Sequence, residues 1–246
     1  MTRLSININK IATLRNARGG NVPDVVQSAI DIQRFGAQGI TVHPRPDERH
    51  IRYQDVYDLK PVVTTEFNIE GRPTKKFIQM VLEVQPDQVT LVPDEEDVLT
   101  SNSGWDTIAH RDFLTEVIGE FKCHGIRTSI FLDPDPKFVP AAAQAGADRI
   151  ELHTEVFAQA YSRKDPEAAL VYIRTAEEAL KSGLVLNAGH DLSLDNISYL
   201  IERIPEIAEI SIGHALIAEA LYLGLENTVQ AYLKRIERAC KNQPRK

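Results

Sequence analysis

Cysteine, positive charge and long apolar runs are all scarce in this sequence of 246 residues. Its two cysteines, Cys123 and Cys240, provide neither a disulfide framework nor a zinc-binding pattern, and they fit a reducing compartment. The formal net charge of −7 argues against general affinity for nucleic acid or an anionic membrane surface. No apolar run approaches the roughly 18 residues of a membrane span, and no signal-peptide pattern opens the chain. We therefore expect a soluble cytoplasmic protein without nucleic-acid or membrane partners.

A linker is also missing, because no stretch rich in Pro, Gly or Ser and no low-complexity run divides the chain. With 43% apolar residues, a chain of this length can build one large core. We expect a single domain over residues 1–246.

Short apolar strands alternate with amphipathic segments throughout. The expected strands are 4–8, one ending at 43, then 62–69, 88–92, 127–132, 148–153, 183–187 and 209–212. The expected helices are one from about 21 to 35, then 53–59, 73–84, 107–124, 136–145, 166–182, 193–203, 215–223 and 226–240, with a polar turn at 15–20. Eight alternations in one domain predict a parallel (β/α)8 barrel. A doubly wound sheet is the alternative, but its Gly-rich turn is absent after the first strand.

The first helix has a local signal of its own. Pro23 is expected in its first turn, where a missing N–H costs nothing. Its expected apolar stripe consists of Val22, Val25, Val26, Ala29 and Ile30.

Titratable residues stand at the carboxyl ends of the expected strands, where such barrels carry their catalytic groups. His43 and His190 are candidates for proton transfer. Glu70 is either a general base in the barrel mouth or a solvated carboxylate paired with Arg72. Glu151 belongs to a structural ion pair or to catalysis, and His153 is equally compatible with an ordinary strand-end residue.

Phosphate sites are expected in two places. The free N–H groups of the helix that opens at Gly213-His214 would hold a phosphate. Arg18, Arg45 and His50 are the other cations near the expected mouth. The loop 93–104 is either a lid or a solvated connection.

A metal site is an alternative interpretation, because several His residues and a Glu would suit zinc. The chain has no His-x-His after the first strand and no His-x-x-x-His on a helix. The residues therefore favour acid–base chemistry on a small phosphorylated substrate, with no metal and no organic cofactor.

Seven blocks in order along nearly the whole chain resemble the pyridoxine 5′-phosphate synthase family, which closes the ring of vitamin B6. They are IATLRNARG at 11–19, GITVH at 39–43, NIE at 68–70, LVP at 91–93, IELH at 150–153, NAGH at 187–190 and IGHA at 212–215. The resemblance implies condensation of 1-deoxy-D-xylulose 5-phosphate with 3-amino-2-oxopropyl phosphate. It also implies a homo-oligomer, by family pattern an octamer.

The resemblance implies roles for the matching positions. His43 and Glu70 would accept protons, His190 would donate one, and Glu151 would stabilise a transition state. The amino-ketone phosphate would be bound by Asn7, Arg18, Gly213 and His214, and Asp191 would add negative charge beside the expected phosphate region of the substrate site. The deoxyxylulose phosphate would be bound by Asn9, Lys10, Arg45, His50 and Thr100.

The chain departs from the family pattern in two places. The family has Asn-x-Asp-His where this chain has Asn7-Ile8-Asn9-Lys10, and a Gly where this chain has Asp191. These changes motivate the competing hypothesis of a non-catalytic phosphometabolite-binding relative. A metal-dependent isomerase or hydrolase on the same barrel is the third hypothesis.

Overall fold

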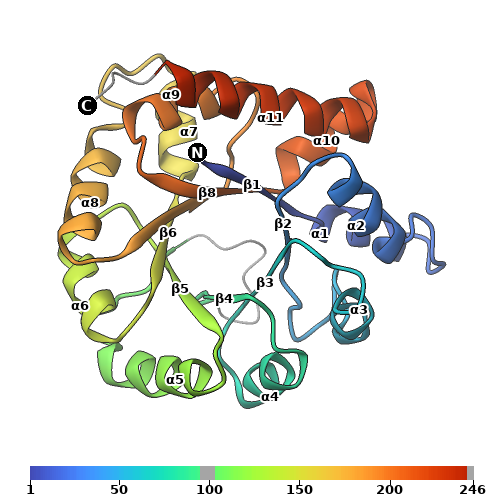
Figure 1. Ribbon diagram of the computed structural model, residues 1–246, viewed down its shortest axis with the longest axis horizontal. Coiled ribbons are helices and arrows are strands. Elements are labelled where there is room, and N and C mark those ends of the chain that lie inside the picture. Colours follow the sequence, from blue (N-terminus) through green and yellow to red (C-terminus); the bar gives the residue numbers. More distant parts are fainter. Residues whose placement is uncertain (95–102, 243–246) are drawn as a thin grey trace.

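Eight parallel strands pair in sequence order and close into a barrel, with β8 hydrogen-bonded to β1 (Figure 1). The structure is a computed structural model that describes residues 1–94 and 103–242. The strands are β1 Arg3–Asn7, β2 Gly39–Val42, β3 Glu66–Gly71, β4 Gln88–Leu91, β5 Arg127–Leu132, β6 Arg149–His153, β7 Val185–Gly189 and β8 Ile207–Ile212. The predicted (β/α)8 barrel is confirmed.

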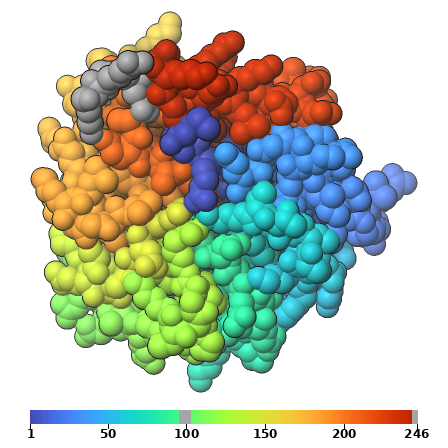
Figure 2. Space-filling model, viewed as in Figure 1, coloured from blue at the N-terminus to red at the C-terminus, as the bar shows by residue number. Residues whose placement is uncertain are grey.

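The helices surround the barrel, and the N-terminal residues, in dark blue, lie at the centre of the face seen in Figure 2. They are α1 Asn9–Asn16, α2 Val25–Arg34, α3 Tyr53–Leu59, α4 Lys75–Val84, α5 Arg111–Cys123, the short 3-10 helix η1 Pro136–Phe138, α6 Val139–Gln144, α7 Glu155–Ser162, α8 Leu170–Lys181, α9 Ile197–Arg203, α10 His214–Leu223 and α11 Leu225–Lys241. None of the described helices is long and apolar enough to cross a membrane.

The apolar core lies between the outer face of the barrel and the helices. Along β1, Leu4 and Ile6 are fully buried and belong to this core, while Ser5 and Asn7 alternate with them and point into the barrel. The inward side chains form polar bonds instead. Ser5 Oγ lies 2.8 Å from Thr41 Oγ1, and Thr90 donates to Asn68 Oδ1 at 3.0 Å. The barrel interior is therefore held by hydrogen bonds beneath its carboxyl end.

Ion pairs close the opposite end of the barrel. Glu66, the first residue of β3, lies 2.7 Å from Arg3 Nη2 and 3.7 Å from Arg149 Nη1. Glu209 of β8 shares both arginines, and burial together with the neighbouring Glu66 raises its pKa to about 8. These charges lie at the amino ends of the strands, away from the mouth where barrel enzymes carry their chemistry.

Two helices were not predicted from the sequence. Residues 9–16 form α1, whose buried side chains are Ile11, Ala12 and Arg15; the buried arginine interrupts the apolar stripe on which helix prediction depends. Residues 155–162 form α7, directly after β6. Helix α2 begins later than predicted, because Asp24 accepts the N–H of Gln27 and caps it.

The expected stripe of the first helix is also partly wrong. Pro23 precedes the cap of α2 rather than lying in its first turn, and Val22 is 83% exposed. The buried face consists of Val25, Ala29 and Ile32.

Candidate active site

Asn7, His43 and Glu70 meet at the carboxyl ends of the first three strands. Strand β3 extends to Gly71, so Glu70 lies inside it, not beyond its end as the sequence predicted. His43 directly follows β2, and its Nδ1 lies 4.0 Å from Glu70 Oε2. Asn7 Nδ2 donates to the same carboxylate oxygen at 3.3 Å. An imidazole, a carboxyl group and an amide therefore lie next to one another at the mouth of the barrel.

The environment shifts the pKa values of His43 and Glu70 in opposite directions. Burial, and next the charge of Arg45, lowers the pKa of His43 well below its ordinary value. Burial, and next the carboxylates of Glu151 and Asp94, raises the pKa of Glu70 well above its ordinary value. Both shifts favour the neutral form of the group.

Glu151 projects from β6 toward β7 and is 4% exposed. A Cβ placed on Gly189 would lie 2.3 Å from Glu151 Oε1, so the carboxylate occupies space that only a glycine leaves open. Burial raises the pKa of Glu151 to about 7. Besides burial, the charge of Glu151 in turn raises the pKa of Glu70, so the two carboxyl groups interact across the mouth.

His190 follows β7 and lies in a group of rings. Its centroid is 5.0 Å from that of His153 and 6.0 Å from that of Phe131. His153 is buried, and its Nδ1 lies 3.1 Å from Asp133 Oδ1. Asp191 Oδ2 lies 3.5 Å from His190 Nδ1, and this contact, followed by other charges including His214, lowers the pKa of Asp191.

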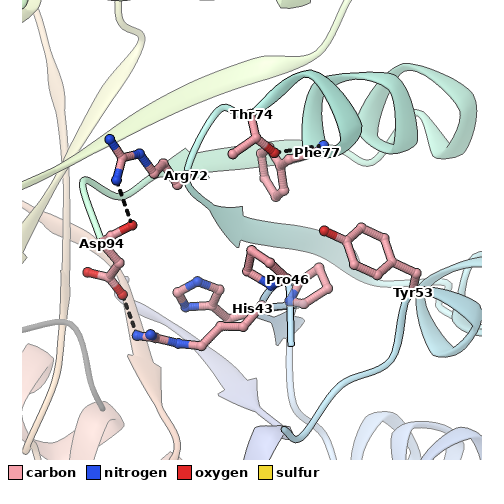
Figure 3. A pocket seen from close by; sticks show the side chains of 9 residues that line it. His43, Pro46, Tyr53, Arg72, Thr74, Phe77 and Asp94 are labelled. Atoms are coloured by element: carbon pink, nitrogen blue, oxygen red, sulfur yellow. Dashed lines mark hydrogen bonds and ion pairs between the residues drawn. The ribbon is translucent and has the colours of Figure 1, made fainter. Parts of the chain in front are cut away.

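A pocket of about 320 Å³ opens beside His43, between the loop after β2 and the beginnings of α3 and α4 (Figure 3). Arg45 and Arg72 line it together with Asp94. Arg45 Nη2 forms an ion pair with Asp94 Oδ2, and Arg72 Nη1 donates to the Asp94 carbonyl at 3.4 Å. Two guanidinium groups at one small pocket suit a phosphate.

His50 lies in the same loop but is not a cation at neutral pH. Burial, followed by the charges of Arg45 and Lys10, lowers its pKa to about 4. The N–H of Ile51 donates to His50 Nδ1 at 2.9 Å, which leaves Nε2 to carry the ring proton. The prediction of a cation is therefore corrected to a neutral N–H donor. Because the charge of Lys10 contributes to the lowered pKa of His50, this charge lies near the loop.

Asn9, which stands where the family pattern has Asp, has a defined structural role. Asn9 Oδ1 accepts the backbone N–H of His43 at 2.9 Å, and the backbone N–H of Asn9 donates to Asn7 Oδ1 at 3.0 Å. An aspartate would supply the same acceptor oxygen. The change to Asn therefore leaves the support of His43 in place.

Four further predicted site residues lie outside these groups of side chains or beyond the described residues. Arg18 is exposed on the turn after α1. Gly213 caps α10 and lies against Asn7, whose Cβ would be 3.2 Å from a Cβ on Gly213; the following His214 is exposed. Thr100 and most of the predicted lid 93–104 lie outside the described residues.

Sequence reasoning missed the residues that hold the loop after β2, which carries His50. Arg15, 1% exposed, forms a two-pronged ion pair with Asp55 at 2.5 and 2.8 Å and donates to the His50 carbonyl at 3.1 Å. Asn16 Nδ2 donates to the same carbonyl at 2.8 Å. The available signal was the helical spacing of Ile11 and Arg15, which lie on one face of α1.

No group of three or more His, Cys, Asp or Glu residues converges on a metal-sized site in the part of the chain that the structure describes. The side chains that do converge carry imidazole, carboxyl, amide and guanidinium groups.

Solved structures show the same fold at low sequence identity. The 3-keto-L-gulonate-6-phosphate decarboxylase of Vibrio cholerae superimposes with a TM-score of 0.65 at 13% identity, covering 96% of this chain and 98% of that chain. A phosphoribosylanthranilate isomerase of Thermotoga maritima gives a TM-score of 0.61 at 13% identity, covering 97% of this chain and 100% of that chain. The fold is therefore that of a (β/α)8 barrel, and titratable groups lie at the mouth where enzymes of this fold carry their active sites.

The family follows from the sequence comparisons. Residues 4–238 match the family model described as "Pyridoxal phosphate biosynthesis protein PdxJ". The pyridoxine 5′-phosphate synthase of Christiangramia forsetii is 62% identical over 237 residues, covering 96% of this chain and all of that protein. The one of Bacteroides fragilis is 62% identical over 233 residues, covering 94% and 98%. The chain belongs to the PdxJ family of pyridoxal phosphate biosynthesis proteins.

Proposed function

We propose that this protein is an active pyridoxine 5′-phosphate synthase. It would condense 1-deoxy-D-xylulose 5-phosphate with 3-amino-2-oxopropyl phosphate and release phosphate and water. The observation that carries the proposal is the meeting of Asn7, His43 and Glu70 beside the Arg45 pocket, in a chain of this family. Joining an amine to a ketone, eliminating water and phosphate, and closing an aromatic ring are successive proton transfers.

The pKa directions fit the roles proposed for the acid–base groups. His43 has a lowered pKa and stays unprotonated, ready to accept a proton. Glu70 has a raised pKa, so it retains a proton that it accepts and can return it in a later step. His190 on the opposite side of the mouth would donate a proton. Glu151, whose pKa is about 7, would stabilise positive charge that develops in the transition state when it is ionised.

The two phosphates would occupy separate subsites. Arg45, neutral His50, Asn9 and Lys10 would bind the deoxyxylulose phosphate, with Thr100 completing that subsite. Asn7, Arg18, Gly213 and His214 would bind the amino-ketone phosphate, and Asp191 would line the same substrate site without contacting the phosphate. The contact of Gly213 with Asn7 supports a shared site at the start of α10, because free N–H groups of a helix start favour an anion.

The geometry of Asn9 favours an active enzyme over the non-catalytic alternative. It retains the bond that fixes the His43 backbone, and it brings a neutral amide where the family has a carboxylate. Lys10 adds a positive charge near His50. Both changes make the subsite more attractive to a phosphate.

We also propose that the chain works in the cytoplasm as a homo-oligomer, an octamer by family pattern. At the end of α10, Leu221 and Tyr222 are 75% and 90% exposed, and Leu223 is exposed beside them. Adjacent exposed apolar side chains support a contact with another copy. Light scattering on the purified protein would measure the subunit number, and a monomer at micromolar concentration would contradict the proposal.

The test of function is a mass-spectrometric search for pyridoxine 5′-phosphate after chelator-treated protein is mixed with both substrates. We expect the product, and we expect none with the Glu70→Gln variant. Binding of both substrates without product would establish the non-catalytic alternative. Product formed by the chelator-treated protein would also remove the metal-dependent isomerase or hydrolase hypothesis.

A further inference from the structure

The turn that carries His190 has an unfavourable backbone conformation. His190 and Asp191 are consecutive non-glycine residues with positive φ, 83° and 56°. This conformation is unfavourable for a residue with a Cβ, and it persists only where the surroundings hold it. The residues that hold this turn therefore decide where the His190 imidazole lies.

Thr154 holds the first half of the turn from the neighbouring strand end. It is fully buried and directly follows β6. Its backbone N–H donates to the Gly189 carbonyl at 3.0 Å, and its hydroxyl lies 2.7 Å from the same oxygen and also bonds the His190 carbonyl. Because the N–H already satisfies Gly189, the single hydroxyl proton is available to His190.

The position of Thr154 makes this use of its hydroxyl informative. Thr154 stands at the N-cap of α7, where a threonine ordinarily accepts an N–H from its own helix. Its side chain makes no such capping bond. The hydroxyl instead bonds carbonyl groups at the end of β7. Thr154 therefore stabilises the turn after β7 and not the start of its own helix.

Asn196 holds the second half of the turn. It is 5% exposed, and its Nδ2 donates to the Asp191 carbonyl at 3.1 Å. Its Oδ1 accepts the N–H of Ser193 at 2.9 Å, which fixes the orientation of the amide. Two consecutive carbonyls, those of His190 and Asp191, are thus each bonded by a buried side chain from a different element.

We propose that Thr154 and Asn196 are positioning residues of the reaction, which hold the His190–Asp191 turn in its strained form and so place the His190 imidazole against the substrate. Neither residue needs to touch a substrate. The inference rests on the proposed role of His190 as the proton donor, and it adds residues to which the family resemblance gave no role.

The decisive experiment is steady-state kinetics of Thr154→Val, which keeps the shape and removes the hydroxyl. We expect kcat to fall by roughly 10- to 100-fold, because misplacing a catalytic group by about 1 Å costs on the order of 10²-fold. The KM values for both substrates should stay within about twofold of wild type, as expected when a transition-state interaction is lost. Thr154→Ser, which restores the donor, should recover most of kcat.

Thr175→Val is the matched control. Thr175 is also fully buried, and its hydroxyl donates to the Val171 carbonyl at 2.8 Å within α8. This variant loses the same kind of bond away from the mouth, so it should lower stability and leave kcat unchanged. Equal kcat losses in Thr154→Val and Thr175→Val, or a Thr154→Ser variant as slow as Thr154→Val, would overturn the proposal.

Asn196→Asp tests the other half of the turn independently and covers the case in which Thr154→Val does not fold. The carboxylate still accepts from Ser193 but faces the Asp191 carbonyl without a donor, so kcat should fall. Asn227→Asp, which loses an exposed bond to the Leu223 carbonyl, should be normal. An unchanged kcat in Asn196→Asp would contradict the role of this residue.

The His190→Gln variant separates this inference from the proposed function. If His190→Gln turns over normally, the role of His190 is wrong and the inference fails with it. If His190→Gln is inactive while Thr154→Val is as fast as wild type, the role of His190 stands and the positioning role of Thr154 is wrong.

Discussion

The Nδ1 of His43 lies 4.0 Å from Oε2 of Glu70, and burial favours the neutral form of both groups. In the proposed reaction, two such groups would transfer protons without first breaking a strong ion pair with each other. The short distance also means that one substrate proton, or a single water, lies within reach of both.

The Glu70→Gln variant tests this pair directly. The amide keeps the shape of the carboxyl group and removes its ability to take up a proton, so turnover should be abolished. Calorimetric binding of 1-deoxy-D-xylulose 5-phosphate should remain close to wild type, because the phosphate pocket is formed by other residues. Near-normal turnover would remove Glu70 from its role.

Arg45→Ala should weaken binding of the deoxyxylulose phosphate. A charge-assisted bond contributes roughly 1.5–3 kcal/mol, so the KM for that substrate should rise at least tenfold while the KM for the amino-ketone phosphate changes little. Arg34→Ala, which removes a surface arginine paired with Asp31, is the control. An unchanged affinity for the deoxyxylulose phosphate would contradict the assignment.

The lowered pKa of His50 predicts a pH dependence of stability. Because the folded pKa is about 4 and the unfolded value about 6.5, the unfolded state binds more protons between these values. The contribution of His50 is therefore present above pH 6.5 and is lost as the pH falls toward 4, by about 2 kcal/mol between pH 7 and pH 5. Urea unfolding of wild type and His50→Gln at both pH values measures the difference. An equal pH dependence in the two proteins would show that His50 is not the cause.

Buried Arg15 supports both the fold and the loop that carries His50. Arg15→Ala leaves Asp55 buried without this partner, which should lower the free energy of unfolding by about 3–5 kcal/mol. The Arg34→Ala control breaks an exposed pair and should cost no more than about 1 kcal/mol. Denaturant unfolding at pH 7 measures both changes. An equal decrease in the free energy of unfolding for the two variants would show that the buried Arg15–Asp55 pair stabilises the fold no more than an exposed pair does.

The sequence predicted the barrel and most of the mouth, because both depend on local patterns. Apolar strands alternating with helices predict the fold, and titratable residues such as His43 and His190 at strand ends predict the location of the site.

What could not be predicted depends on long-range contacts. Arg15 pairs with Asp55, 40 residues away, and no periodicity signals such a bond. The neutral state of His50 arises from burial in the folded loop, which the residue type alone does not reveal. The bond from Thr154 to the turn after β7 likewise exists only because β6 and β7 are neighbours.

Gly189→Ala should displace the carboxylate of Glu151. The added Cβ would lie 2.3 Å from Glu151 Oε1, and Glu151 is buried, so the carboxylate must move or the two strands must separate. We expect kcat to fall by roughly 100-fold, the cost of displacing a catalytic group by about 1 Å.

Gly119→Ala provides the matched control, because a Cβ at this position in α5 meets nothing within 4 Å, and the substitution favours the helix by about 0.5–1 kcal/mol. Kinetics and thermal unfolding of the two variants should therefore diverge, with Gly189→Ala slow and Gly119→Ala fully active and slightly more stable. A Gly189→Ala enzyme with normal kcat would show that the position of Glu151 against β7 is not required for turnover.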